Sequence, residues 1–268
     1  MKAKFTTFAV LSGMALAIPS ALTFAEEKDW GQYQVGETRS GYTYAQPETR
    51  AMQDDEFANP AMLWVEHGEE QWSTVNGEAG KSCQSCHNDA SDTMKTVGSS
   101  YPKIEKDTGK LTNVENRVNR CLTENMKAKP WKYDSQNMLG MVSYVKHQSF
   151  GEPVNVKIDG DAAPWFEKGK AFYNQRRGQL DMACKHCHVD NAGTMIRANL
   201  LSQGQGNGFP TYRLKWQKPG SLHRRFRGCN KQVRAKPYKT GSDEYLALEL
   251  YVMHRAKGLP VETPAVRN

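Results

Sequence analysis

Two short motifs constrain this chain more than any other feature of its sequence. Each consists of two cysteines separated by two residues and followed at once by a histidine: Cys83, Cys86 and His87 in CQSCH, and Cys184, Cys187 and His188 in CKHCH. This is the spacing of a c-type haem site, in which both thiols bond to one porphyrin and the histidine faces the iron. One copy could be half of a zinc site or a redox disulfide. Two copies predict two covalently bound c-type haems.

The N-terminus has the pattern of a secretory signal peptide. Two lysines in the first four residues precede an uncharged tract from Phe5 to Ala25. We predict that residues 1–25 are removed on export. The tract is long enough to span a bilayer, but its small and hydroxyl residues favour a cleaved peptide over an anchor. We therefore expect a periplasmic protein whose mature part has no membrane span.

An internal repeat predicts the architecture. Trp64 and Gly68 recur as Trp165 and Gly169, and the same shift of 101 positions relates the two haem motifs. A glycine on one face of a helix would let a second helix cross closely. The order in each unit is helix, haem motif, irregular segment and closing helix, with closing helices at about Ser135–Gln148 and Ser242–Lys257.

We therefore predict a mainly α protein with two tandem cytochrome c-like domains, at residues 26–155 and 156–268. A linker is expected within residues 151–163, which contain Gly and Pro. The second unit is longer by about six residues, and we expect the insertion in the glycine-rich tract Ser202–Gly208. Residues 26–60 have no counterpart in the second unit, so the repeat does not place them.

Two cysteines remain outside the haem motifs. Cys121 lies 34 residues after His87, and Cys229 lies 41 residues after His188, so they hold matching places in the repeat. One cysteine per unit fits one thiolate ligand per iron. Two alternatives stay open: a disulfide between these cysteines, and a methionine as the distal ligand, for which the candidates are Met126, Met138, Met141 and Met195.

The segment around Cys229 is strongly basic. Residues 191–242 contain eleven Lys or Arg and no Asp or Glu, so this segment is +11 in a chain of net charge +7. Export makes a nucleic-acid partner improbable, and the charge suits a small anion or an acidic partner instead. Nearby cations also favour the thiolate form of a cysteine. Arg225 is our first choice for clamping an anion, with Arg224 and Arg227 as alternatives.

The two CxxCH motifs, the cysteine after each, and the stretch Arg-Phe-Arg-Gly-Cys that ends at Cys229 resemble the SoxA family. These proteins are the dihaem subunits of SoxAX cytochromes in bacterial thiosulfate oxidation, and the resemblance covers essentially the whole mature chain. It implies His/Cys axial ligation, here His87 with Cys121 and His188 with Cys229. It also implies that Cys229, found as a persulfide, is the catalytic group and that Arg225 binds the substrate.

The resemblance further implies a reaction and its partners. An L-cysteine S-thiosulfotransferase joins thiosulfate oxidatively to a cysteine of the carrier SoxYZ, and two electrons leave through the monohaem cytochrome SoxX. Thiosulfate is a dianion, which agrees with the basic segment. Two other functions stay open at this point: a plain dihaem electron carrier, and a thiosulfate dehydrogenase that forms tetrathionate.

Overall fold

A computed structural model describes residues 29–268 of the chain, so the predicted signal peptide lies outside the described residues. Helices dominate the structure, as predicted, and each strand is only two or three residues long. Among the described helices, none combines the length and the apolar composition that crossing a membrane requires.

The first half of the described chain contains most of the short elements. Its helices are α1 (Pro47–Asp54), α2 (Met62–Ser73), α3 (Gln84–His87), α4 (Ala90–Thr93), α5 (Val97–Ser100), α6 (Val114–Arg120) and α7 (Gln136–His147). Its strands form two antiparallel pairs: β1 (Gln34–Val35) with β2 (Thr38–Arg39), and β3 (Lys103–Ile104) with β4 (Leu111–Thr112).

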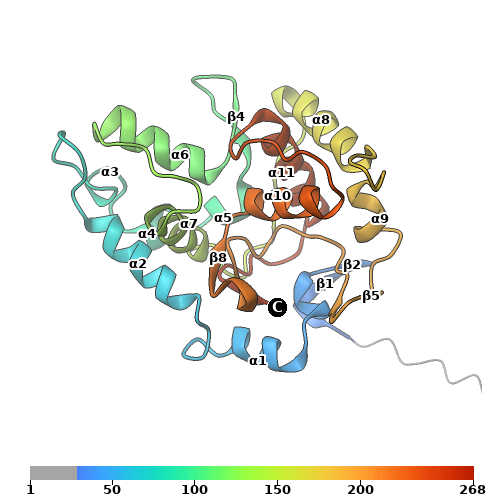
Figure 1. Ribbon diagram of the computed structural model, residues 1–268. Helices are drawn as coiled ribbons and strands as arrows, with labels where there is room; N and C mark the ends of the chain where they lie inside the picture. Colours follow the sequence, from blue (N-terminus) through green and yellow to red (C-terminus); the bar gives the residue numbers. More distant parts are fainter. Residues whose placement is uncertain (1–28) are drawn as a thin grey trace, which may run out of the picture.

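The second half repeats the helix order in a longer form. Its helices are α8 (Ala163–Asn174), α9 (Cys184–His188), α10 (Leu222–Gln232) and α11 (Asp243–Arg255). Its strands are β5 (Met195–Ile196), β6 (Asn199–Leu200), β7 (Thr211–Arg213), β8 (Lys218–Gly220) and β9 (Ala265–Arg267). Figure 1 shows the two sets of helices beside each other, with the N-terminal segment below them.

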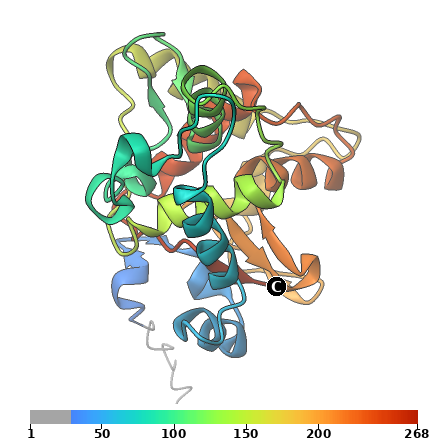
Figure 2. The same ribbon diagram turned by 90° about the vertical axis from the view of Figure 1, so that its left-hand side faces the viewer.

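The first and last helices of each unit cross closely at the repeated glycines. A Cβ atom on Gly68 would lie 2.2 Å from the carbonyl oxygen of Gly140, so only a glycine fits where α2 meets α7. A Cβ atom on Gly169 would lie 2.0 Å from the carbonyl oxygen of Ala247, where α8 meets α11. Figure 2 shows α2 crossing in front of α7. The predicted close crossing is confirmed in both units.

The predicted helix starts are also close to the observed ones. The Ser135 hydroxyl accepts a hydrogen bond from the Met138 N–H and caps α7. Ser242 holds the same position before α11, but its hydroxyl accepts no capping hydrogen bond and is buried without a partner. Ser242 is therefore the N-cap residue by position only, and the helix begins where predicted.

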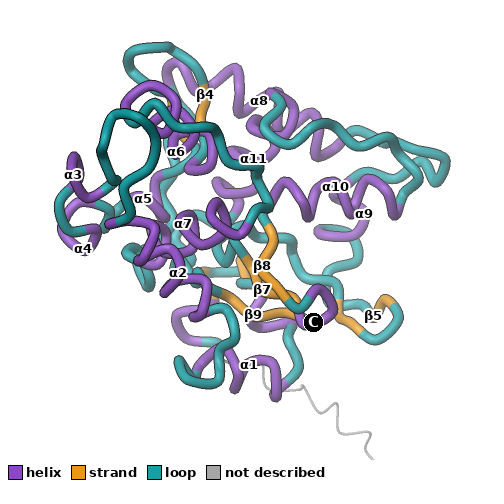
Figure 3. Tube along the Cα trace, turned by 60° about the vertical axis from the view of Figure 1, so that its left-hand side comes forward, coloured by secondary structure: helices purple, strands orange, loops and turns teal. Residues whose placement is uncertain are grey.

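A three-stranded sheet was not predicted from the sequence. Strand β7 lies in the centre, antiparallel to β8 and parallel to β9 near the end of the chain (Figure 3). The strands are short and two of them lie in the segment read as irregular, so no periodicity indicates them. The sheet leads directly into α10, because β8 ends at Gly220 and the helix begins at Leu222.

The segment expected as a linker connects α7 to α8 but is packed rather than free. Val154 and Val156 are buried among Leu246, Leu250 and other apolar residues of α11. The Val154 N–H donates to the Leu259 carbonyl at 2.9 Å. The chain after α11 therefore returns along this segment and holds it in place.

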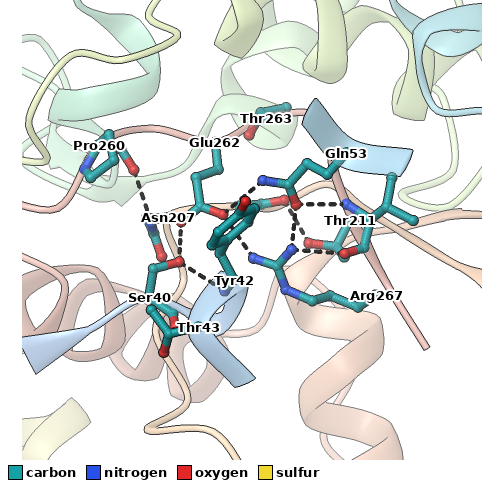
Figure 4. Close-up of polar contacts among 12 residues, drawn as sticks. Ser40, Tyr42, Thr43, Gln53, Asn207, Thr211, Pro260, Glu262, Thr263 and Arg267 are labelled. Carbon is teal, nitrogen blue, oxygen red and sulfur yellow. Dashed lines mark hydrogen bonds and ion pairs between the residues drawn. The ribbon is translucent and has the colours of Figure 1, made fainter. Parts of the chain in front are cut away.

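Residues 29–60, which the repeat could not place, pack against the end of the chain and the glycine-rich tract (Figure 4). Glu262, only 1% exposed, is the centre of this network. Its carboxylate accepts hydrogen bonds from Ser40, from Asn207 at 2.8 Å and from Gln53 at 3.2 Å, and it pairs with Arg267 at 2.8 Å. The N-terminal segment is thus fastened to the second unit.

A buried polar cluster joins the two units. Asn113 and Glu115 at the start of α6 meet His223 of α10 and Glu249 of α11, and all four are at least 94% buried. One oxygen of Glu115 has no hydrogen-bond partner there. Burial, and then the charge of Glu249, raises the pKa of Glu115 to about 7.

We expect Gly169→Ala to lower the free energy of unfolding by about 1–3 kcal/mol, because the added methyl group forces α8 and α11 apart. Chemical denaturation of the haem-loaded protein measures this. Leu63→Ala serves as control, because Leu63 is 67% exposed on α2 and its loss should change stability by less than about 0.5 kcal/mol. Equal stability of the Gly169→Ala variant and the unsubstituted protein would contradict the close crossing.

We expect Glu115→Gln to stabilise the protein at high pH. Because the pKa of Glu115 is raised from 4.5 to about 7 on folding, the folded state holds the proton more tightly, and stability falls as pH rises through this window. At pH 8 the variant should gain about 1–3 kcal/mol of unfolding free energy, and the gain should vanish below about pH 4.5. The exposed Glu66→Gln should show no such pH-dependent gain; a gain at every pH in Glu115→Gln would contradict the assignment.

Candidate functional site: two cysteine-histidine centres

The second centre is built from two helices that bring the CKHCH motif and Cys229 together. Helix α9 carries Cys184, Cys187 and His188, and Cys229 lies on α10. The Cys229 side chain lies near His188, which helps to lower the pKa of its thiol. Burial raises the pKa of Cys184 and of Cys187, and the charge of Cys229 is the second largest cause of both increases. The remaining cysteine therefore lies opposite the motif of its own unit.

The orientation of His188 is fixed by the glycine-rich tract. Its Nδ1 lies 2.8 Å from the carbonyl oxygen of Ser202. A carbonyl only accepts, so Nδ1 carries the proton and the lone pair of Nε2 is free to bind a metal. Gly204 also packs against the ring, and a Cβ atom there would lie 2.7 Å from the ring carbon Cγ. A ligand histidine, two thiols on one helix and a facing cysteine fit a covalently attached haem.

Arg225 gives Cys229 an unusual acidity. Burial raises the pKa of the Cys229 thiol, but the charge of Arg225, and then His188, outweigh burial and lower the pKa to about 7. In the part of the chain that the structure describes, no carboxylate lies within ion-pair distance of Arg225. Its positive charge is therefore available to the thiolate and to an incoming anion.

Arg213 is a second cation beside Cys229, and the sequence analysis did not single it out. Its charge also lowers the pKa of Cys229. Burial, and then the charge of Arg225, lowers the pKa of Arg213 to about 10. Its Nε donates to the backbone oxygen of Asn268 at 2.7 Å, and its guanidinium lies 5.2 Å from the ring centre of Trp216. Arg213 lies at the end of β7, twelve residues before Arg225 in the chain, and the turn into β8 brings it beside Cys229. The spacing of residues in the sequence therefore did not indicate that Arg213 belongs to the site.

The two alternative arginines make other contacts. The guanidinium of Arg224 lies over the ring of Trp216, 4.5 Å from its centre. Arg227 donates from Nη1 to the carbonyl oxygen of Tyr238 at 2.9 Å. Of the three arginines on α10, Arg225 is thus the one whose charge acts most strongly on Cys229.

The first centre has the same parts with a different charge balance. Cys83, Cys86 and His87 lie at and within α3, and Cys121 begins a π-helical turn that continues α6. The charge of Cys121 contributes to the raised pKa of Cys83, so these two thiols also lie near each other.

Arg117 stands four residues before Cys121, as Arg225 does before Cys229, but it pairs with Glu105 at 3.3 Å. Arg120 pairs with the same carboxylate at 2.7 Å. Burial keeps the pKa of Cys121 above its ordinary value despite Arg117. The two centres therefore contain the same set of cysteines and histidine and differ in their uncompensated positive charge.

The disulfide alternative is decided by the placement of Cys121 and Cys229. No disulfide joins any of the six cysteines in the described chain, and Cys121 and Cys229 lie at separate centres, so the disulfide alternative is wrong. Of the methionine candidates, Met138 and Met141 are fully buried in the apolar core around Trp72.

Comparison with known proteins agrees with this arrangement. Residues 67–154 and 168–261 match the family model described as SoxA/TsdA, cytochrome c domain. The chain is 51% identical to the L-cysteine S-thiosulfotransferase subunit SoxA of Pseudaminobacter salicylatoxidans, over 85% of this chain and 80% of the relative. It is 48% identical to the subunit of the same name from Paracoccus pantotrophus, over 85% and 79%.

A solved structure is similar over nearly the same length. It is the crystal structure of SoxXA from P. pantotrophus, with a TM-score of 0.84 and 47% identity. The match covers 86% of this chain and 87% of the other. The two-unit arrangement is therefore shared with a cytochrome of known structure.

We expect Gly204→Ala to disturb the second centre alone, because the new methyl group would collide with the ring of His188. Optical and EPR spectra of the ferric protein should change for one haem and not for the other. Gly193→Ala is the matched control: Gly193 also has a positive φ, of 87°, but nothing lies within 4 Å of a Cβ atom there. Identical spectra for Gly204→Ala and Gly193→Ala would contradict the contact with His188.

Proposed function

Because the chain belongs to the SoxA/TsdA cytochrome c family, we propose that Cys229 and Arg225 form the catalytic centre of an L-cysteine S-thiosulfotransferase subunit. The reaction joins thiosulfate to a cysteine of the carrier SoxYZ. The observation that supports this site is the uncompensated positive charge beside Cys229, which the otherwise similar first centre lacks.

The chain carries covalently bound c-type haems, and the two CxxCH motifs are where we place them. Cys83 and Cys86 would hold one haem, with His87 and Cys121 as its axial ligands. Cys184 and Cys187 would hold the other, with His188 and Cys229. Each haem, when bound, supplies a one-electron acceptor.

The residues around Cys229 can gather and orient the substrate. Thiosulfate carries two negative charges, and Arg225 offers a guanidinium group without a carboxylate partner in the described chain. Arg213, bonded to the backbone oxygen of Asn268, adds a second positive charge beside it. Charge-assisted hydrogen bonds to its sulfonate oxygens would leave the outer sulfur directed at Cys229. The pKa of about 7 keeps much of Cys229 as the nucleophilic thiolate near neutral pH.

The overall reaction balances as an oxidation. Thiosulfate and the carrier thiol form one S–S bond, and they release one proton and two electrons. If thiosulfate first joins the Cys229 sulfur, that step is the one that releases the two electrons. The carrier thiolate then attacks the thiosulfate sulfur that is bonded to Cys229, and Cys229 leaves as a thiolate. The electrons leave through the monohaem partner SoxX. We place this reaction in the periplasm, as covalent haem attachment and the expected export of the chain suggest.

We expect Arg225→Gln to lower kcat/KM for thiosulfate about 10- to 100-fold, because one charged hydrogen-bonding group is lost. Arg213→Gln should have a smaller effect of the same kind, mainly through a higher KM. Steady-state turnover with SoxX, SoxYZ and thiosulfate measures both. The matched control is Arg224→Gln, whose side chain lies over Trp216; equal losses in Arg224→Gln and Arg225→Gln would contradict the assigned role.

The same assay separates the proposed reaction from its alternatives. Mass spectrometry should find the carrier cysteine heavier by one thiosulfate, and Cys229 carrying additional sulfur after exposure to thiosulfate. Tetrathionate as the sole product would instead indicate a thiosulfate dehydrogenase. Unchanged turnover in Arg225→Gln and Cys229→Ala would leave only an electron carrier.

A further inference from the structure

The helix that carries Arg225 and Cys229 is held at its first turn by the other unit. Ser221 is the N-cap of α10, and its hydroxyl accepts a hydrogen bond from the Arg224 N–H at 3.1 Å. The backbone N–H of Ser221 in turn donates to the carboxylate of Asp134 at 3.0 Å. Asp134 lies 87 residues earlier in the chain, just before α7 of the first unit.

The first unit also contacts α10 at His223, which is 1% exposed. The ring of Tyr133, the residue before Asp134, stacks on it at a centroid distance of 5.3 Å and an angle of 14°. The Gly241 N–H donates to Nδ1 of His223 at 3.0 Å, so the ring proton is on Nε2.

The edge of the His223 ring is connected to the first unit as well, through Glu249 and Asn113. Its Nε2 lies 3.0 Å from Oε2 of Glu249. The same carboxylate oxygen accepts a hydrogen bond from the side chain of Asn113 at 2.9 Å. Buried groups of this kind are costly to leave unpaired, so together they allow α10 one orientation against the first unit.

This orientation matters because α10 is one continuous helix. His223 is two residues before Arg225 and six before Cys229. A helix moves as a rigid rod, so a rotation or shift at Ser221 and His223 is carried to both functional side chains. A displacement of about 1 Å can cost about 100-fold in rate when a reaction depends on the placement of groups.

We propose that Asp134 and Tyr133 are positioning residues: through Ser221 and His223, the first unit sets the orientation of α10 and so the placement of Arg225 and Cys229. This inference rests on the proposed function of those two residues. The first unit would then contribute to the sulfur chemistry even if no electron passes through the first haem.

The test uses two disrupting variants and a conservative partner for each, in the complex with SoxX. Asp134→Ala removes the acceptor for Ser221, whereas Asp134→Asn keeps an oxygen there. Tyr133→Leu removes the ring that stacks on His223, whereas Tyr133→Phe keeps it. Asp107→Ala is the control, because it removes a carboxylate of the first unit that pairs with Arg120 and not with α10.

We expect Asp134→Ala and Tyr133→Leu to raise KM for thiosulfate about tenfold and to change the EPR signal of the second haem only. Asp134→Asn and Tyr133→Phe should stay near the unsubstituted values in both measurements. A double variant, Cys83→Ala with Cys86→Ala, assigns the two haem signals because it lacks the first attachment site.

Two results would overturn the inference. One is an unchanged second-haem signal in both disrupting variants. The other is the same change in Asp107→Ala, which would show a general loss of stability. If the complex forms no thiosulfate conjugate at all, the proposed function fails, but the second-haem signal still decides whether the first unit positions α10.

Discussion

The close crossing of two helices in each unit is the constraint on which the rest of the structure depends. Gly68 and Gly169 let α2 and α8 approach the backbones of α7 and α11 directly. The crossing fixes each pair as a rigid support, and the chain between the two helices then supplies the haem motif and the facing cysteine. The two units therefore share one architecture, because the same helix packing occurs in both.

Charge compensation separates the two otherwise similar centres. In the first, Glu105 neutralises Arg117 and Arg120 near Cys121. In the second, the surrounding sequence contains no carboxylate over 52 residues, and among the described residues no carboxylate pairs with Arg225, so its charge acts on Cys229. Two centres with the same cysteines and histidine can thus differ in chemistry, because the acidity of a thiol and its affinity for anions depend on the neighbouring charges.

Contacts between the two units hold the structure together in a way that the sequence repeat alone does not indicate. The N-terminal segment is fastened to the second unit through Glu262, and the packed linker lies against α11. The start of α10 is held by Tyr133 and Asp134 from the first unit. A tandem repeat has therefore become one interlocked structure, in which each unit supports the other.

The sequence by itself determined the haem motifs, the repeat, the helical class and the pairing of each leftover cysteine with one unit. These depend on local spacing, which covalent haem attachment and helix periodicity make strict. Only the tertiary structure placed Arg213 beside Cys229, formed the β7–β8–β9 sheet and brought Asp134 to Ser221. Such contacts join residues that are far apart in the chain. They depend on how the two units pack together, and the spacing of residues within one segment does not indicate that packing.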